Sequence, residues 1–483
     1  MRIARRVLPA LAALTLLVSS TSVGAAVSSR KVALPAGLSD AQSFEKIDCQ
    51  SPGNCMAVGL AQAPSGTPVI VASQEVNGTW KAAVRVTLPS TPPSTGFVAL
   101  NDLTCASASS CLLTATYSPN TTQQVVARME FANGAWATGV RVYLGGSEFS
   151  GKNAPRQPLN LQGAASGCWA PRNCVMSFLY NNLDGDWSTA YLVETNGTWG
   201  AIHRYPKATP YSSNTGIHEF SCVSTSGCVA IGSYADDDGL FHLFANTLSN
   251  GTWGTQVASN GPSNIAPSES LIPSAAMCTS LTTCVVTGTY SSRSSNVTQF
   301  TATMSAGVLA NAQQVTMPTG YVQKNNPSSY SPPALGCSSD GSCVISSWGY
   351  ATSSLAIQRV MAVRVTNGVV GTATPLSLLS NATVTANSPA GITSVACASA
   401  NHCVILGDVV TTGAVIKAFS VTMSGGSWQR ALAVALPGDA HPRYAVPQIV
   451  GLHCFTGLTC TAVGTYGNNA QNGQLMTIDG LGV

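Results

Sequence analysis

Cysteine is the residue type here with the widest choice of chemistry, because thiols form disulfides, bind metals and carry out redox reactions. All 16 cysteines fall into eight C-x5-C pairs that recur every 54 to 63 residues. Redox-active pairs are usually C-x-x-C, and no histidine stands at zinc-ligand spacing beside these pairs. We therefore predict eight structural disulfides. They join Cys49 with Cys55, Cys105 with Cys111, Cys168 with Cys174, Cys222 with Cys228, Cys278 with Cys284, Cys337 with Cys343, Cys397 with Cys403, and Cys454 with Cys460.

A second recurring set of side chains is aromatic. In five repeats a tyrosine follows the second cysteine by six residues and opens a segment rich in Asn, Gln and Ser, such as YNNLDGDWS. Rings that stack and amides that donate hydrogen bonds suit neutral, hydroxyl-rich ligands such as glycans. The alternative is that the tyrosines cap a sheet and the amides only solvate loops. The candidate ligand-binding residues are Tyr117, Tyr180, Trp187, Tyr234, Tyr290, Trp348 and Tyr466.

Two acidic clusters stand out in a chain with only 8% charged residues. Clustered carboxylates on a loop are the ligands that calcium prefers, although neither cluster supplies the six or more oxygens of a full site. Calcium is therefore the one candidate cofactor, and a solvated acidic turn is the alternative. The candidate metal ligands are Asp184, Asp186, Asp236, Asp237 and Asp238.

Catalytic motifs do not emerge from the remaining polar residues. No motif identifies two of the 19 acidic residues as a catalytic carboxylate pair, and nothing similar to G-x-S-x-G surrounds a serine. The six histidines are scattered, without metal-ligand spacing. We predict no catalytic residue, which favours a protein that is not an enzyme while leaving that question open.

The elements that must position these residues repeat with the cysteines. Each second cysteine opens an apolar run, as in CVAIG, with a small residue usually four positions later. An Asn-Gly or similar dipeptide then stands about 22 residues past that cysteine, and in five repeats a tryptophan follows its glycine by two residues. Asn-Gly between apolar runs is a strong hairpin signal. Four antiparallel strands per repeat, eight times over, predict an all-β, eight-bladed β-propeller with one disulfide per blade.

The two ends of the chain predict how the ring closes. The last repeat stops at QLMTIDG, before a fourth strand, whereas the N-terminal segment RKVALPAGLSD resembles the fourth strands of other repeats. We expect residues from about 30 to 36 to complete the last blade, which removes an exposed sheet edge. Two smaller domains are the alternative to a single ring.

The N-terminus has the features of a secretory signal peptide. MRIARRVLPALAALTLLVSSTSVGAA combines arginines, an apolar run and small residues, so we expect residues 1–25 to be removed and residues 26–483 to form one domain. The apolar run is too short for a transmembrane helix, so no membrane insertion is expected. Three of the 22 basic residues lie in this segment, which leaves 19 against 19 acidic residues and no basic field for nucleic acid. The protein is expected to be secreted.

The repeat unit S-C-x5-C-x-A-V-G-x-Y, followed by N-G-x-W, resembles units of secreted actinobacterial β-propeller proteins. FSCVSTSGCVAIGSY and VNGTW carry this resemblance, which spans essentially the whole mature chain. It implies the propeller fold and export, and it implies no reaction.

Three functions follow as hypotheses. The first is a non-catalytic binding module for an extracellular glycan or protein. The tight turns of each repeat are regular, so the variable loops gather on the opposite face: those between the second and third strands, and those from the fourth strand to the next repeat. The second is a polysaccharide hydrolase or lyase, with Asp184, Asp186, Asp237 or Glu148 lining the central opening. The third is a structural protein of the cell envelope. The oligomeric state is left open.

Overall fold

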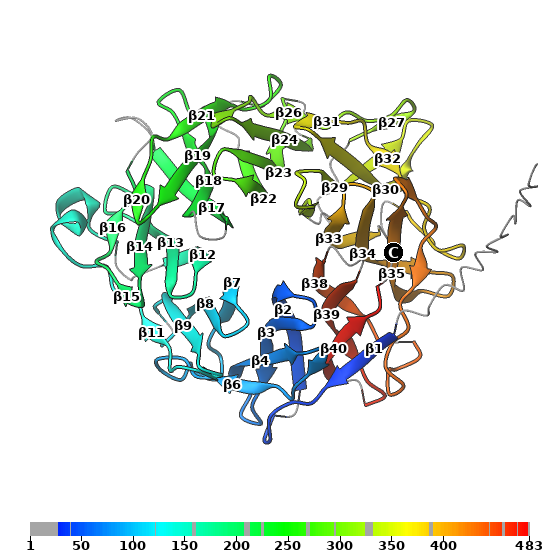
Figure 1. The fold of residues 1–483 in the computed structure, drawn as a ribbon, viewed down its shortest axis with the longest axis horizontal. Coiled ribbons are helices and arrows are strands. Elements are labelled where there is room, and N and C mark those ends of the chain that lie inside the picture. The colour runs from blue at the N-terminus through cyan, green and yellow to red at the C-terminus, as the bar shows by residue number, and fades with distance from the viewer. Residues whose placement is uncertain are drawn as a thin grey trace, which may run out of the picture.

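The structure, a computed structural model, describes residues 28–481 except 39, 121, 157–160, 207–212, 224–226, 267–270, 294–295, 324–331, 386–389, 444, 456–458 and 471. The expected signal peptide, residues 1–25, lies outside the described residues. The described strands form eight antiparallel sheets arranged as a ring, and the two ends of the ring meet (Figure 1). The eight-bladed all-β propeller is thus confirmed. Among the described residues, no helix has the length and apolar character needed to cross a membrane.

Blades 1 to 4 share one order, in which the first strand lies innermost and the later strands follow outward. Blade 1 contains β2 (Asp40–Ser51), β3 (Asn54–Gln62), β4 (Pro68–Val76), β5 (Thr79–Trp80) and β6 (Val84–Val86), and blade 2 contains β7 (Val98–Ser107), β8 (Ser110–Tyr117), β9 (Val125–Ala132), β10 (Ala135–Trp136) and β11 (Val140–Arg141). Blade 3 contains β12 (Leu161–Ala170), β13 (Asn173–Asn181), β14 (Trp187–Thr195), β15 (Thr198–Trp199) and β16 (His203–Arg204). Blade 4 contains β17 (Ser213–Val223), β18 (Gly227–Ala235), β19 (Phe241–Ser249), β20 (Thr252–Trp253) and β21 (Val257–Asn260).

Blades 5 to 8 keep this order with two variations. In blade 6 the innermost position is shared by two short strands, and in blade 8 the outermost strand comes from the N-terminus. Blade 5 contains β22 (Leu271–Ser280), β23 (Thr283–Ser291), β24 (Val297–Ser305), β25 (Val308–Leu309) and β26 (Gln313–Gln314), and blade 6 contains β27 (Tyr321–Val322), β28 (Leu335–Cys337), β29 (Cys343–Ala351), β30 (Ser354–Thr366), β31 (Val369–Val370) and β32 (Thr374–Pro375). Blade 7 contains β33 (Gly391–Ser399), β34 (His402–Thr411), β35 (Val415–Ser424), β36 (Ser427–Trp428) and β37 (Leu432–Ala433). Blade 8 contains β38 (Gln448–Cys454), β39 (Cys460–Gly467), β40 (Gly473–Asp479) and β1 (Ser28–Val32).

The outermost strand is the element that differs most from expectation. It was expected to run continuously from the tryptophan, but in seven blades it is two short pieces, such as β5 and β6, that both pair with the third strand. The turn before it is as predicted: Asn77 and Gly78 have φ of 50° and 76°, the two positive values that a type I′ turn requires. Even Ala306, which replaces asparagine in blade 5, has φ of 49°.

All eight predicted disulfides are confirmed, and each pairs two cysteines of one blade. In every blade the two cysteines lie directly opposite one another on neighbouring strands, as Cys397 and Cys403 do on β33 and β34. Their Cα atoms lie 4.0 Å apart, so the bond joins strands that the sheet already brings together. Each disulfide closes the hairpin of its own blade. From blade 1 to blade 8 the bonds join Cys49 to Cys55, Cys105 to Cys111, Cys168 to Cys174, Cys222 to Cys228, Cys278 to Cys284, Cys337 to Cys343, Cys397 to Cys403, and Cys454 to Cys460.

The small residue four positions after the second cysteine has a packing cause. The first strand bulges opposite it, so a backbone carbonyl points at the second strand. A Cβ built on Gly407 would lie 2.1 Å from the carbonyl oxygen of Gly391, and Gly288 stands in the same relation to Ile272. In these two blades glycine is required, because a Cβ would clash with that carbonyl oxygen.

The core lies between the blades. Apolar clusters fill the space between neighbouring sheets, for example Ile70, Val86 and Tyr117 between blades 1 and 2. Ring closure also follows the prediction: β1 pairs with β40, with Lys31 opposite Met476, so Ser28–Val32 rather than residues 30 to 36 completes blade 8. The N-terminal strand therefore joins the first and last parts of the chain.

Candidate functional site

One face of the ring carries the loops that differ between repeats. There each outer strand leads into a connector that crosses to the innermost strand of the next blade. Several connectors pair with a residue at the end of that next blade's second strand or just after it. These contacts are isolated bridges: Pro155 with Asn182, Ile265 with Ser292, Ala382 with Thr411, and Ala440 with Asn468. The connectors are thus held against rigid blades, which suits a binding surface. We call this side the loop face.

The five candidate tyrosines are buried at the base of the loop face. Their exposed fractions run from 0% for Tyr117 and Tyr180 to 6% for Tyr234. Three hydroxyls contact the incoming connector: Tyr117 with Ser90 at 3.2 Å, Tyr290 donating to Asn264 at 2.8 Å, and Tyr466 donating to Asp439 at 2.5 Å. The Tyr180 hydroxyl accepts from Arg204, and the Tyr234 ring stacks on His242. Buried rings do not fit the expected stacking on a ligand, and the alternative role of capping the sheet fits them better.

Removing one such hydroxyl has a measurable cost. We expect Tyr290→Phe to lower the free energy of unfolding by about 1 kcal/mol, because the side-chain carbonyl oxygen of Asn264 loses its donor. The connector should also open more often, so the Ala266 amide, which donates to Ser291, should exchange with solvent faster. Denaturant unfolding and hydrogen exchange measure the two effects.

Tyr143→Phe is the matched control for this change. Tyr143 is 64% exposed, and its ring lies against the Arg141 guanidinium, a contact that phenylalanine keeps. Equal unfolding free energies for the two variants would contradict the role assigned to the tyrosine hydroxyls.

The other two aromatic candidates stay open as predictions. Trp187 begins β14 opposite Asn181, and Trp348 lies on β29 opposite Val360. Both side chains are partly exposed. Ligand contact through Trp187 or Trp348 remains a prediction.

The acidic loops are organised as turns. The Asp236 carboxylate accepts the amides of Asp238 and Leu240, and it pairs with His242 at 2.8 Å. The hydrogen bond from His242 holds the pKa of Asp236 below its usual range. Asp237 is exposed.

Blade 3 carries the other acidic loop, in which Asp184 is exposed and Asp186 partly exposed. Within the described part of the chain, no three His, Cys, Asp or Glu side chains are grouped to hold a metal ion. Calcium at these loops remains a prediction without a preassembled set of ligands.

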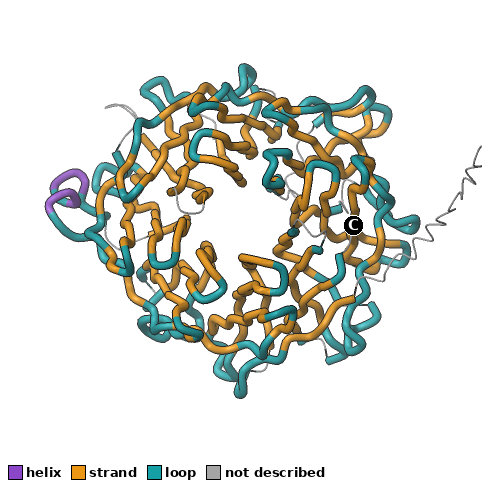
Figure 2. Tube along the Cα trace, in the orientation of Figure 1, coloured by secondary structure: helices purple, strands orange, loops and turns teal. Residues whose placement is uncertain are grey.

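Glu148 does not line the central opening. It lies on the short helix η1 (Ser147–Phe149), which with η2 (Gly151–Asn153) forms an excursion at the outer rim (Figure 2). Its carboxylate accepts the Arg204 amide and pairs with His203 Nδ1, both at 2.9 Å. The Arg204 amide, with help from His203, lowers the pKa of Glu148. Its place at the rim corrects the expected one at the centre.

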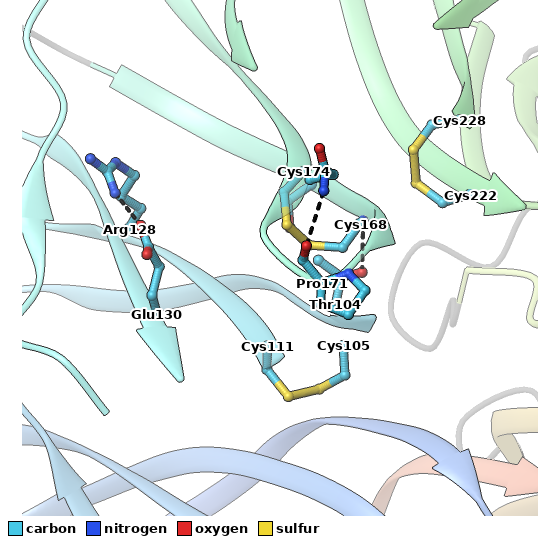
Figure 3. Close-up of a disulfide and its surroundings, with 12 residues drawn as sticks. Thr104, Cys105, Cys111, Arg128, Glu130, Cys168, Pro171, Cys174, Cys222 and Cys228 are labelled. Atoms are coloured by element: carbon cyan, nitrogen blue, oxygen red, sulfur yellow. Dashed lines mark hydrogen bonds and ion pairs between the residues drawn. A yellow bond between two sulfur atoms is a disulfide. The ribbon is translucent and has the colours of Figure 1, made fainter. Parts of the chain in front are cut away.

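The acids nearest the centre are others, which the sequence did not single out. Asp48 and Asp102 lie on the innermost strands β2 and β7, and they accept backbone amides of the next blade, Cys105 at 2.6 Å and Ser166 at 2.8 Å. Thr104 does the same for Cys168 (Figure 3). Innermost strands have an unpaired edge, so these side chains satisfy amides that the sheet leaves without partners.

Burial changes the protonation of these central acids. It raises the pKa of Asp48 to about 7, and the charge of Asp102 adds to the effect. Burial likewise raises the pKa of Glu219 on β17, where Asp102 adds to the shift and Lys46 opposes it. Lys46 also lowers the raised pKa of Asp102. A partly protonated acidic group therefore lies toward the ring centre.

Two clefts occupy equivalent places between neighbouring blades. Each cleft begins where the outer strand makes its last contact with the third strand of its sheet. That contact joins Val86 to Ile70 in the cleft between blades 1 and 2, and Leu376 to Val360 in the cleft between blades 6 and 7. The first has a volume of 180 Å³ and the second 810 Å³.

One residue that differs between the two places is the tyrosine. At blades 1 and 2 Tyr117 packs with Ile70 and Val86 and reaches the cleft-lining Ser90. At blades 6 and 7 the same position of the repeat is Val409, which packs with Val360 and Leu376. The smaller side chain leaves the connector without a hydroxyl partner at that position. A missing tyrosine thus accompanies the wide cleft.

Comparison with known proteins finds distant likenesses alone. No protein family model matches this sequence, and no curated protein matches it. Among solved structures, the BP39L lectin of Burkholderia pseudomallei is similar, with 11% identity over 82% of this chain and 100% of that chain and a TM-score of 0.42. A polysaccharide lyase, ulvan lyase, has 8% identity over 94% and 96% of the two chains and a TM-score of 0.41. These likenesses are too distant to bear on ligand or activity.

Proposed function

We propose that this protein is a secreted, non-catalytic module that binds an extracellular glycan in the 810 Å³ cleft between blades 6 and 7. The observation that carries the proposal is the cleft itself, on the loop face of a rigid ring. Its volume lies within the roughly 300–1,000 Å³ typical of sites for small ligands. The eight disulfides fit an oxidising, extracellular compartment, where glycans are abundant partners.

The lining of the cleft suits a sugar ring. Leu378, Leu379 and Val384 offer an aliphatic wall for the C–H face of a sugar. Ser377 and Thr383 add hydroxyls, and Arg430 adds donors for sugar oxygens. Polar groups at the edge of an apolar wall fix the orientation of a ligand.

Binding of the oxidised mature protein to a glycan array and to insoluble polysaccharides tests this function. Val409→Tyr is the informative variant, because it introduces the side chain that closes the equivalent place at blades 1 and 2. Five blades already hold a tyrosine at this position, so the fold should tolerate it. Selective binding that Val409→Tyr abolishes is the expected result. Binding that survives in a folded Val409→Tyr protein would contradict this location.

A second candidate, a polysaccharide hydrolase or lyase, is favoured by the central acids. A carboxyl group with a raised pKa can serve as a general acid, as Glu219 could beside Asp102. The same polysaccharide assays distinguish the two candidates. Release of reducing ends or unsaturated products that Glu219→Gln removes would replace the binding proposal, whereas silence across the panel would favour a structural role in the envelope.

A further inference from the structure

The cleft between blades 6 and 7 has an unbalanced charge. Its lining includes Arg359 and Arg430 and no acidic residue. This is unusual in a chain with only 8% charged residues and no net charge after the expected loss of the signal peptide. A cleft with cations and no anions attracts a ligand of negative charge.

Neither arginine side chain is bound by another described residue. Arg359 and Arg430 are exposed, and among the described residues neither guanidinium has a hydrogen-bond or ion-pair partner. Other arginines bind backbone carbonyls: Arg85 donates to Ala36, Arg293 to Ile265 and Arg364 to Ala400. The Arg430 guanidinium thus keeps its donors free for a ligand in the cleft.

A third cation lies close to the cleft by the register of blade 7. Lys417 on β35 is the partner of Val409 on β34, and paired residues of neighbouring strands point to the same side of a sheet. Val409 packs against blade 6, so Lys417 lies on that side of blade 7 as well, and it is exposed. Arg359 holds the equivalent position in blade 6, so its side chain leaves β30 on the side of blade 5, where Met361 and Val363 pack. Arg430 and Lys417 are therefore the two cations whose side chains can reach the cleft.

We propose that this cleft selects acidic saccharides, whose carboxylate or sulfate group binds Arg430 and Lys417 while the sugar ring lies on the aliphatic wall. This inference rests on the proposed glycan binding and names its ligand class. Guanidinium groups suit both anions because their planar donors bind two oxygens at once.

Titration calorimetry with defined probes tests the inference. The probes are oligogalacturonate for the carboxylate, sulfated dextran oligomers for the sulfate, neutral dextran oligomers, and inorganic sulfate. We expect at least one acidic oligomer to bind about tenfold or more tightly than the neutral one, and to weaken as salt is added. Arg430→Gln and Lys417→Gln should each lower that affinity about tenfold. Preference between the two acidic oligomers identifies the anion.

Arg85→Gln is the matched control, because Arg85 lines the narrow cleft that Tyr117 accompanies. It should leave the affinity unchanged. Neutral and acidic oligomers that bind equally well, without loss in Arg430→Gln, would overturn the acidic ligand class while leaving glycan binding intact. Binding of inorganic sulfate alone, lost in Arg430→Gln, would support the anion site and overturn the glycan function. Absence of binding by all four probes would overturn the inference, and the array then decides the glycan function separately.

Discussion

We expect the folded protein to be more stable at about pH 5.5 than at about pH 8, by several kcal/mol of unfolding free energy. The cause is a set of buried carboxyl groups. Glu75 and Glu194 are 3% and 2% exposed, and burial raises the pKa of each to about 7. In the unfolded chain a glutamate titrates near pH 4.3. Each group therefore stabilises the fold fully below about pH 4 and loses that contribution, roughly 2–3 kcal/mol, as the pH rises through 7.

Other groups set the position of the optimum. Burial raises the pKa of Asp48 to about 7 and that of Asp408 to about 6, which adds to the same trend. His218 and His453 act in the opposite direction, because burial lowers their pKa to about 4. Their contribution is complete above about pH 6.5 and is lost as the pH falls toward 4. Because four carboxyl groups outnumber two histidines, the two trends place maximal stability between about pH 4 and pH 5, with a decline as the pH rises further.

Thermal melts across this pH range measure the effect. Glu75→Gln should raise the melting temperature at about pH 8, because it replaces a charge that burial disfavours, and should change little at about pH 5. A wild-type protein that is more stable at pH 8 than at pH 5.5 would show that these carboxyl groups are not buried in solution.

Reduction of the eight disulfides is expected to have the largest effect on stability. Each bond closes a loop of seven residues, and loop-closure entropy assigns roughly 2 kcal/mol to such a loop. Eight such loops sum to more than the 5–15 kcal/mol typical of a whole domain. The reduced chain, once unfolded, should therefore fail to refold until it is oxidised.

Refolding from denaturant with and without reductant, followed by circular dichroism, checks this expectation. The combined variant Cys397→Ala and Cys403→Ala is the control for the loss of one bond, and it should fold with a loss of about 2 kcal/mol. Full recovery of the native signal in excess reductant would show that the sheets alone stabilise the ring.

The repeat made most of the fold predictable. The spacing of Cys397 and Cys403 determines the first hairpin, and Asn77 with Gly78 determines the second because both residues must adopt positive φ. Those local signals recur in every blade, so the ring followed by extrapolation. The break between β5 and β6 was not predicted, because alternation of apolar residues continues across it in the sequence.

The site was less predictable because it depends on contacts between blades. Tyr290 looked available for a ligand, since the connector that covers it differs from repeat to repeat and gives no repeated signal. Asp48, Asp102 and Glu219 come from three blades and meet only in the folded ring. One partial signal was present: Val409 is one of three residues, with Ala61 and Gly349, that interrupt the tyrosine pattern, and the wide cleft lies beside it.

The closure of the ring by β1 also has a consequence for the order of assembly. A ribosome produces β1 before its partner β40, and the strands of seven blades lie between them in the sequence. During synthesis β1 must therefore wait as an unpaired strand while seven blades and most of the eighth form behind it. Among the described blades, the pairing of the five residues of β1 with β40 is the only strand pairing that joins distant parts of the sequence. We therefore expect the closed ring to begin to open at the pairing of β1 with β40.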